Sequence, residues 1–116
     1  MKKLVALFCL LLVSGHSLAS SVYFEEHSDV LEEEELDKLE SSLPNKNHGI
    51  VLRAFDNSEG PSFNSQVLRF ARCAEVRAHL IERGFPAHKI QIEEGPLKCK
   101  GCSGKKARRV DLITQQ

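Results

Sequence analysis

The sequence predicts an α+β fold, a two-layer sandwich of order β-α-β-α-β-β in which two helices cover one face of a mixed sheet. Three observations support this prediction. A nearly continuous apolar run at residues 49–55 is typical of an interior strand. Two stretches with helical spacing of apolar residues flank that run. Two β-prone segments follow the second helical stretch, with no linker long enough to separate two domains.

The first 19 residues are expected to lie outside this fold. Two lysines precede an apolar run at residues 4–13, and small residues in Ser17-Leu18-Ala19 suit a signal-peptidase site. The run is shorter than the roughly 20 residues that a membrane span needs. We therefore predict a cleaved signal peptide at residues 1–19, a single domain at residues 20–116 and no membrane span in the mature chain.

The remaining elements follow from the order of apolar, polar and turn residues. In chain order we expect a strand at 22–24, a helix at 31–43, a strand at 49–55, a turn at 56–61, a helix that stops at Gly84, and strands at 89–93 and 108–114. Ser28 is a candidate cap for the first helix. Gly84 can adopt the left-handed conformation common after a helix. Arg108 or Arg109 is expected to secure the last strand through a carboxylate or a carbonyl group.

On the second helix, the apolar residues define the side that is expected to face the core. That side carries Phe70, Cys73, Ala74, Val76, Leu80 and Ile81. Cys73 is therefore expected to be a buried small hydrophobe rather than a reactive thiol. Arg72 lies at the margin of this side, near the start of the helix, where it can reach toward the turn that holds Asp56.

The distribution of charge limits the classes of partner. The predicted mature chain carries 14 basic and 16 acidic residues, a balance that argues against nucleic acid. Residues 25–40 hold nine acids, and residues 98–109 hold six bases and no acid, which we interpret as two solvated faces. No Ser/His/Asp order, phosphate-binding glycine loop or paired carboxylate site is present in the sequence, so we predict no enzyme.

Several residues, in their order, resemble a known domain family. The matching residues are the series FxxxSxxLxxxExxxL from Phe24 to Leu39, the strand that ends in Asp56, then Gly60, Phe63-Asn64, Leu68, Arg72, Cys73, Val76, Leu80, Gly84 and the terminal Arg-Arg-Val-Asp-Leu. This pattern resembles the OmpA C-terminal-like domain, the peptidoglycan-binding module of Gram-negative cell envelopes. The resemblance spans about residues 24–112.

The resemblance implies a non-catalytic module that binds the diaminopimelate of the peptidoglycan stem peptide. In that family an Asp after the second strand and an Arg on the second helix hold this group, and the matching positions are Asp56 and Arg72. Free diaminopimelate carries an ammonium and a carboxylate on one carbon, so its recogniser needs an anion and a fork-shaped cation. We expect the two side chains to face each other across a gap sized for this head group. Asn64, Asn57 and Arg69 are further candidates, Arg69 as a replacement or competitor for Arg72.

The resemblance also implies a place in the cell envelope. We expect a periplasmic protein, peripheral to the outer membrane, that links the cell wall to the outer envelope. Its partners would be the stem peptide and an outer-membrane or envelope-complex protein, with no cofactor and no metal. An interaction module that has kept the fold without binding glycan is one alternative.

The cysteines allow another interpretation. Cys99 and Cys102 form a C-x-x-C in a loop rich in glycine and lysine, and nearby lysines favour thiolates. In an oxidising compartment the simplest interpretation is a structural disulfide between them, with a bridge from Cys73 to either as the open alternative. A small periplasmic thiol/disulfide or metal protein that uses this loop is the rival function, although zinc would need two more ligands.

Overall fold

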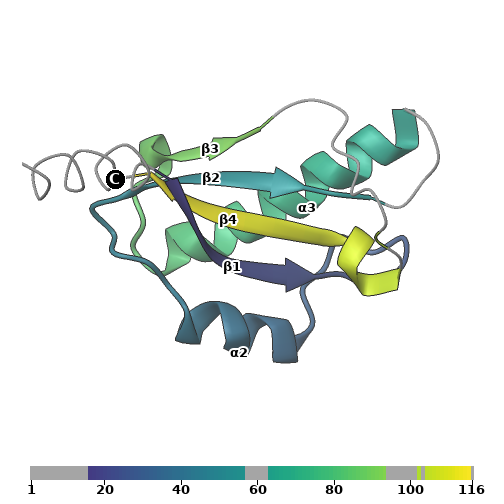
Figure 1. Ribbon diagram of the computed structural model, residues 1–116, viewed down its shortest axis with the longest axis horizontal. Helices are drawn as coiled ribbons and strands as arrows, with labels where there is room; N and C mark the ends of the chain where they lie inside the picture. The colour runs from purple at the N-terminus through teal and green to yellow at the C-terminus, as the bar shows by residue number, and fades with distance from the viewer. Residues whose placement is uncertain (1–15, 57–62, 94–101, 103, 116) are drawn as a thin grey trace, which may run out of the picture.

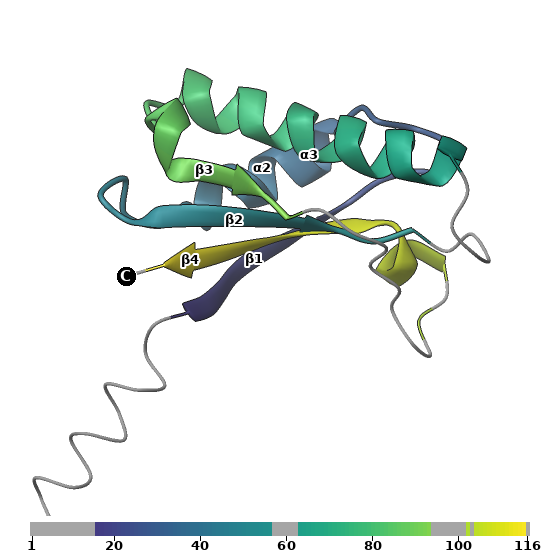
Figure 2. The same cartoon turned by 90° about the horizontal axis from the view of Figure 1, so that it is seen from above.

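The computed structural model describes residues 16–56, 63–93, 102 and 104–115 of the 116-residue chain. Its elements are β1 (His16–Tyr23), α2 (Glu33–Ser41), β2 (Gly49–Ala54), α3 (Phe63–Glu82), β3 (Ile90–Ile92) and β4 (Arg109–Gln115), with short 3-10 helices at Ala87–Lys89 and Gly104–Ala107. Figures 1 and 2 show both α-helices on the same side of one sheet. The predicted α+β class and the order of the elements are confirmed.

The sheet has the strand order β1-β4-β2-β3. The strand β4 pairs antiparallel with both β1 and β2, whereas β2 and β3 are parallel. Two arginines at the start of β4 have the structural role predicted from the sequence. Arg108 Nε donates to the carbonyl oxygen of Phe24 at 3.1 Å, and Arg109 Nε donates to Asp111 Oδ1 at 2.9 Å.

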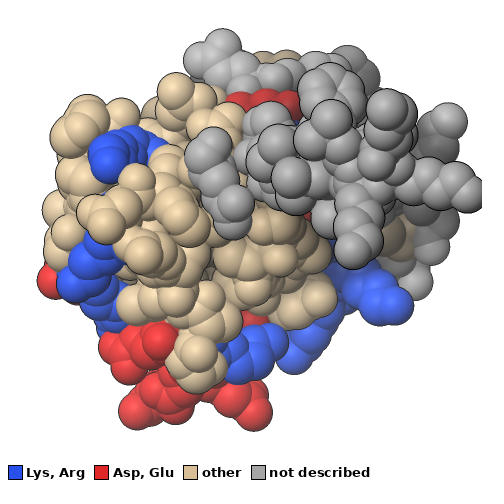
Figure 3. Space-filling model, turned by 60° about the vertical axis from the view of Figure 1, so that its left-hand side comes forward, with Lys and Arg blue, Asp and Glu red and all other residues tan. Residues whose placement is uncertain are grey.

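The core lies between the sheet and the two helices. It is formed by buried apolar residues from all of these elements, among them Val22, Phe24, Leu39, Ile50, Leu52, Cys73, Val76, Leu80, Val110 and Leu112. Within the described chain, no helix is long and apolar enough to cross a membrane. Figure 3 shows acidic and basic side chains next to one another along the lower edge of one face. Ion pairs such as Lys38 with Glu35 and Arg83 with Glu40 mix the two signs in the same way.

Only part of the predicted apolar side of α3 faces the core, where Cys73, Val76 and Leu80 are buried as predicted. Phe70 and Ile81 are 61% and 38% exposed, and Ala74 is also exposed, so their predicted burial was wrong. Arg69 and Arg72 are buried on the sheet side instead. The physical reason is that Arg72 finds its partners in other parts of the chain, namely Asp56 and the carbonyl groups of Ser28 and Glu25. The pattern of apolar residues along α3 contains no information about these partners.

Two details near the N-terminus also differ from the expectation. The strand β1 begins at His16, well before the predicted strand, and its register with β4 shifts between Leu18 and Ser20. Ser28 does not cap α2, because its hydroxyl accepts a hydrogen bond from Val30 N and the helix begins after Glu32. The turn that contains Ser28 instead contacts α3, where Arg72 Nε donates to the Ser28 carbonyl oxygen.

Candidate functional site

Arg72 is the most completely enclosed charged side chain of the described chain. None of its surface is exposed, and its guanidinium lies 5.3 Å from the centre of the Phe24 ring. Its Nε donates to the carbonyl oxygen of Ser28 at 2.8 Å, and its Nη2 donates to that of Glu25 at 3.2 Å. Both carbonyls belong to the turn after β1, in which His27 has a φ of 61°. Arg72 therefore anchors this turn to α3.

Asp56 lies at the other side of the same guanidinium. It follows β2, and its Oδ2 accepts a hydrogen bond from the Ser65 hydroxyl at 2.8 Å. Arg72 Nη1 lies 3.9 Å from Asp56 Oδ1. The structure thus brings together the acid and the base that the sequence singled out. It adds Ser65, which sequence reasoning missed, although a hydroxyl in the first turn of the helix that follows Asp56 is a natural partner for that carboxylate.

The pair is an ion pair without a direct hydrogen bond. Arg72 Nη1 is buried and has no hydrogen-bond partner in the described chain, and a separation of 3.9 Å from Asp56 is beyond hydrogen-bond range. Burial lowers the pKa of Arg72, and the Asp56 carboxylate opposes that shift. Arginine nevertheless stays protonated in proteins. A buried charged donor that lacks an acceptor costs about 1–3 kcal/mol. Arg72 Nη1 is such a donor, and it lies beside the Asp56 carboxylate.

The space between the two groups is narrower than the sequence predicted. At 3.9 Å they leave no room for an amino-acid head group, and the Asp56 side chain is only 8% exposed. A ligand can therefore touch both groups only after the site opens. The closed pair contributes to folding in the absence of a ligand.

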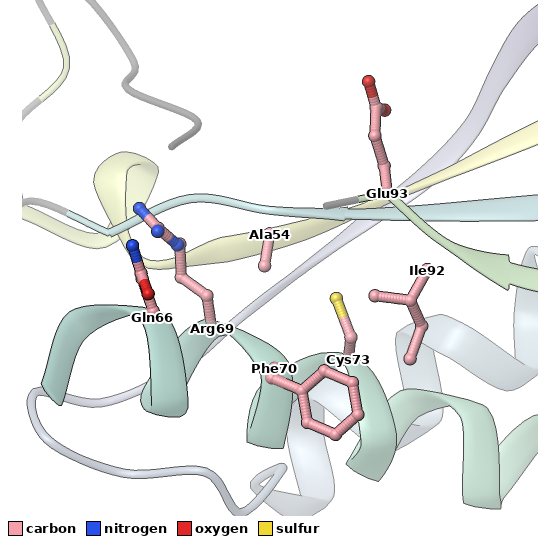
Figure 4. Close-up of a pocket in the computed structure, with 7 residues that line it drawn as sticks. All are labelled: Ala54, Gln66, Arg69, Phe70, Cys73, Ile92 and Glu93. Atoms are coloured by element: carbon pink, nitrogen blue, oxygen red, sulfur yellow. The ribbon is translucent and has the colours of Figure 1, made fainter. Parts of the chain in front are cut away.

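Arg69 lies one turn before Arg72 and lines an open cavity. The cavity, of about 330 Å³, lies between α3 and the strands β2 and β3. Its lining residues are Ala54, Gln66, Arg69, Phe70, Cys73, Ile92 and Glu93. In Figure 4 the side chains of Arg69 and Gln66 extend from α3 toward the strands, whereas Glu93 points away from the helix. Glu93 forms an ion pair with Arg53. Arg69 is thus the guanidinium that borders open space.

The other predicted site residues are placed only in part. Asn64 belongs to the first turn of α3. Asn57 and Cys99 lie outside the described residues. No cluster of three or more His, Cys, Asp or Glu side chains that could hold a metal ion occurs in the described ranges.

The two described cysteines differ in state. Cys102 takes part in a disulfide, and Arg109 Nη1 lies 3.7 Å from its Sγ. Cys73 is a free thiol that is 1% exposed, so its predicted burial is confirmed and the alternative bridge through Cys73 is not formed. Burial raises the pKa of Cys73 to about 12, while the charge of Arg69 acts in the opposite direction.

We expect the Cys73 thiol to resist modification in the folded protein. We also expect its burial to make the free energy of unfolding decrease as the pH rises in the alkaline range. From an ordinary pKa near 9, the unfolded thiol ionises first, whereas the folded thiol keeps its proton until about pH 12. Between these values the free energy of unfolding falls with rising pH, by at most about 1.4 kcal/mol per unit. Urea unfolding at several pH values measures this slope. Cys73→Ala is the control, and an equal slope in that variant would contradict the prediction.

Comparison with known proteins supports the fold. No family model and no curated protein matches the sequence. Among solved structures, the OmpA-like domain of FopA1 from Francisella tularensis has a TM-score of 0.63 at 13% identity, covering 80% of this chain and 68% of that one. The peptidoglycan-associated lipoprotein from Burkholderia pseudomallei has a TM-score of 0.58 at 20% identity, with 82% and 89% covered. The periplasmic domain of Helicobacter pylori MotB has a TM-score of 0.56 at 15% identity, with 87% and 72% covered. The chain therefore has the OmpA-like fold.

Proposed function

We propose that this chain with an OmpA-like fold is a non-catalytic periplasmic module that binds peptidoglycan through the diaminopimelate of the stem peptide. One protein of the same fold is named as a peptidoglycan-associated lipoprotein. A second is the periplasmic domain of MotB. The fold is thus used in the cell envelope, and the site formed by Asp56 and Arg72 supplies the chemistry that such a ligand requires.

The observation that carries the proposal is the buried Arg72 Nη1 without a partner, beside the Asp56 carboxylate. In the bound state the ligand carboxylate accepts hydrogen bonds from Nη1, and the ligand ammonium contacts Asp56. Arg72 keeps its orientation because Nε and Nη2 are held by the backbone carbonyls of Ser28 and Glu25. The ligand thereby satisfies a donor that the protein alone leaves unsatisfied, and each charged hydrogen bond contributes about 1.5–3 kcal/mol.

Binding in this way requires the closed pair to open. Because neither Arg72 nor Asp56 is freely exposed, association is expected to be slower than for a preformed surface site. Arg69 lines the neighbouring cavity, and in this proposal it receives a second carboxylate of the stem peptide. In this proposal Asn64 and Asn57 supply polar contacts to the peptide.

We also propose that residues 1–19 are a signal peptide that directs export to the periplasm and is cleaved after Ala19. The mature protein then lies in the periplasm, peripheral to the outer membrane. The mature chain would then begin at Ser20 and keep the part of β1 that follows the register shift, from Ser20 opposite Leu112 to Tyr23 opposite Arg109. Intact-mass measurement of the secreted protein is expected to give the mass of residues 20–116. A mass that includes residues 1–19 would contradict this proposal.

Co-sedimentation with insoluble peptidoglycan tests the proposed function. We expect the protein to sediment with peptidoglycan that contains diaminopimelate, and an excess of free diaminopimelate to release it. Peptidoglycan in which lysine replaces diaminopimelate is the matched control, because lysine lacks the second carboxylate and cannot engage Arg72 Nη1. Equal sedimentation with both polymers, or sedimentation with neither, would count against the proposal.

A further inference from the structure

The cavity between α3 and the strands β2 and β3 has one polar end and one apolar end. In Figure 4 Arg69 and Gln66 extend from α3 at one end of the cavity. Cys73 and Ile92 lie at the other end, with Ala54 between the two ends. The volume of about 330 Å³ lies at the lower end of the range for small-molecule pockets, about 300–1,000 Å³. The cavity therefore has the size for a small organic molecule.

Arg69 places a positive charge at the polar end of the cavity. Its side chain is only 8% exposed, and no hydrogen bond or ion pair joins it to any residue in the described part of the chain. The other charged residue of the lining, Glu93, is paired with Arg53 and points away from α3. A buried charge without a partner is unfavourable for folding, and such groups are rare in folded proteins. A ligand that supplies the missing anion accounts for this one.

The Cys73 thiol does not supply the missing negative charge. Burial raises its pKa to about 12, and the opposing effect of the Arg69 charge is the smaller of the two. The thiol therefore stays protonated at neutral pH and acts as part of the apolar surface. The effect of Arg69 on this pKa also indicates that the positive charge is felt within the cavity. The described lining thus favours an anion.

The rest of the lining suits an apolar group. Ala54 and Ile92 contribute aliphatic side chains from the ends of β2 and β3, and Phe70 contributes an aromatic ring from α3. Phe70 is 61% exposed although it lies on a helix that packs against the core. An apolar group bound in the cavity would remove part of this ring from water, which is favourable through the hydrophobic effect. The exposed ring thus has a role at this site that packing within the domain does not give it.

We propose that this cavity binds a small organic monocarboxylate, with its carboxylate group on Arg69 and its apolar group against Phe70 and Ile92. The planar guanidinium matches a carboxylate through two parallel hydrogen bonds. The Gln66 amide, which is exposed three residues before Arg69, can donate a further one. One cation balances one negative charge, so a monocarboxylate suits the described lining better than a phosphate dianion does.

Two sources can supply a group of this chemistry. One is a free short-chain carboxylic acid. The other is the end of a peptide whose last residue is small and apolar; this source rests on the proposed function, in which Arg69 receives a second carboxylate of the stem peptide. Both present a carboxylate joined to a small apolar group, so their recognition by Arg69 is the same. A free acid is therefore the simplest probe of the cavity, and its competition with peptidoglycan distinguishes the two sources.

Titration with 4-methylpentanoate, followed by nuclear magnetic resonance, tests the site. We expect saturable shifts of the Ile92 methyl signals and of the Arg69 side-chain N–H signals at millimolar concentrations of the acid. The matched control is 4-methylpentanamide, which has the same shape and no negative charge. The amide is expected to bind at least about tenfold more weakly, because it loses a charged hydrogen bond. The absence of saturable shifts with the acid, or equal affinity for the amide, would overturn the proposal.

Gln66→Glu tests the position of the carboxylate without a change in the core. Gln66 is exposed and lies three residues before Arg69 on α3, so a glutamate there places a carboxylate beside the guanidinium. We expect 4-methylpentanoate binding to fall about 10- to 150-fold, the equivalent of one charged hydrogen bond. The matched control is Gln91→Glu, at an exposed glutamine of β3 that does not line the cavity. Unchanged binding by Gln66→Glu, or equal weakening by both variants, would contradict the assignment of the carboxylate to Arg69.

Arg69→Met separates a binding role from a structural one. Because the described residues give Arg69 no partner, we expect the free energy of unfolding to stay the same or to rise. Binding of 4-methylpentanoate should fall by the same factor as in Gln66→Glu. Arg77→Met makes the same substitution at a half-buried arginine of α3 outside the cavity and should leave binding unchanged. An Arg69→Met variant that binds the acid as tightly as the unaltered protein would show that Arg69 is not the anion-binding group.

Sedimentation with peptidoglycan in the presence of saturating 4-methylpentanoate identifies the source of the carboxylate. Release of the protein assigns the cavity to a carboxylate of the stem peptide, whereas continued sedimentation assigns it to a free acid. The titration itself needs no peptidoglycan. Failure of 4-methylpentanoate to bind therefore overturns this inference alone, and failure to sediment counts against the proposed function alone.

Discussion

Replacement of Arg72 by alanine is expected to destabilise the domain by about 3–5 kcal/mol, the range found when one partner of a buried ion pair is removed. Arg72 is fully enclosed, and it holds Asp56 on one side and the carbonyl groups of Glu25 and Ser28 on the other. The substitution leaves the Asp56 carboxylate buried without its cation and frees the turn after β1. Because small domains have only about 5–15 kcal/mol of stability, much of the protein should unfold on mild heating.

Urea denaturation followed by circular dichroism measures this loss. The control is Arg53→Ala, which removes an arginine whose ion pair with Glu93 is partly exposed on both sides. Exposed pairs of this kind contribute about 0–1 kcal/mol. Similar losses for the two variants would show that Arg72 does not have the structural role described here.

Replacement of Asp56 by asparagine is expected to weaken peptidoglycan binding about 10- to 150-fold, the equivalent of one charged hydrogen bond. Asparagine has nearly the same shape as aspartate, and its carbonyl oxygen can still accept the Ser65 hydroxyl hydrogen bond. It cannot offer a negative charge to the ligand ammonium. This variant keeps Arg72 and its hydrogen bonds to the carbonyl groups of Ser28 and Glu25, so we expect a smaller loss of stability than for Arg72→Ala.

Asp111→Asn is the matched control for that measurement. Asp111 is 7% exposed and accepts hydrogen bonds from Arg109 and Ser21, so its replacement also removes a buried carboxylate from an arginine. It lies in β4, away from the contacts of Arg72. We expect it to lower stability and to leave sedimentation of the folded protein unchanged. Equal loss of binding in both variants would mean that stability, and not the Asp56 charge, controls attachment.

The order of the elements could be predicted from the sequence because each one depends on local signals. The nearly continuous apolar run of β2, the turn after it and Gly84 past the end of α3 are properties of short segments. Gly84 has the positive φ expected there, at 96°. The burial of Arg72 depends instead on carbonyl groups 44 and 47 residues earlier in the chain. No pattern within α3 contains that information.

The same limit explains the error on the apolar side of α3. Periodicity assigns the richest apolar sector to the core, but α3 carries apolar residues around most of its circumference. Arg69 and Arg72 pack toward the sheet, where Asp56 and the turn after β1 lie. Phe70, Ala74 and Ile81 consequently face outward. Asp56 and Arg72 were singled out from the sequence by their places at the end of an apolar run and near the start of the next helix, and a family pattern marks both positions. Ser65 carries no such mark.

A titration of isotope-labelled protein with free diaminopimelate, followed by nuclear magnetic resonance, tests the central claim most directly. The site predicts saturable shifts of the Arg72 side-chain N–H signals and of the Asp56 and Ser65 backbone amides. It predicts no comparable shifts with Nα-acetyl-lysine amide, which keeps the side-chain ammonium but has no free carboxylate. Saturation that leaves the Arg72 signals unchanged, or equal shifts with both compounds, would show that this buried ion pair is structural only and that the ligand, if bound, lies elsewhere.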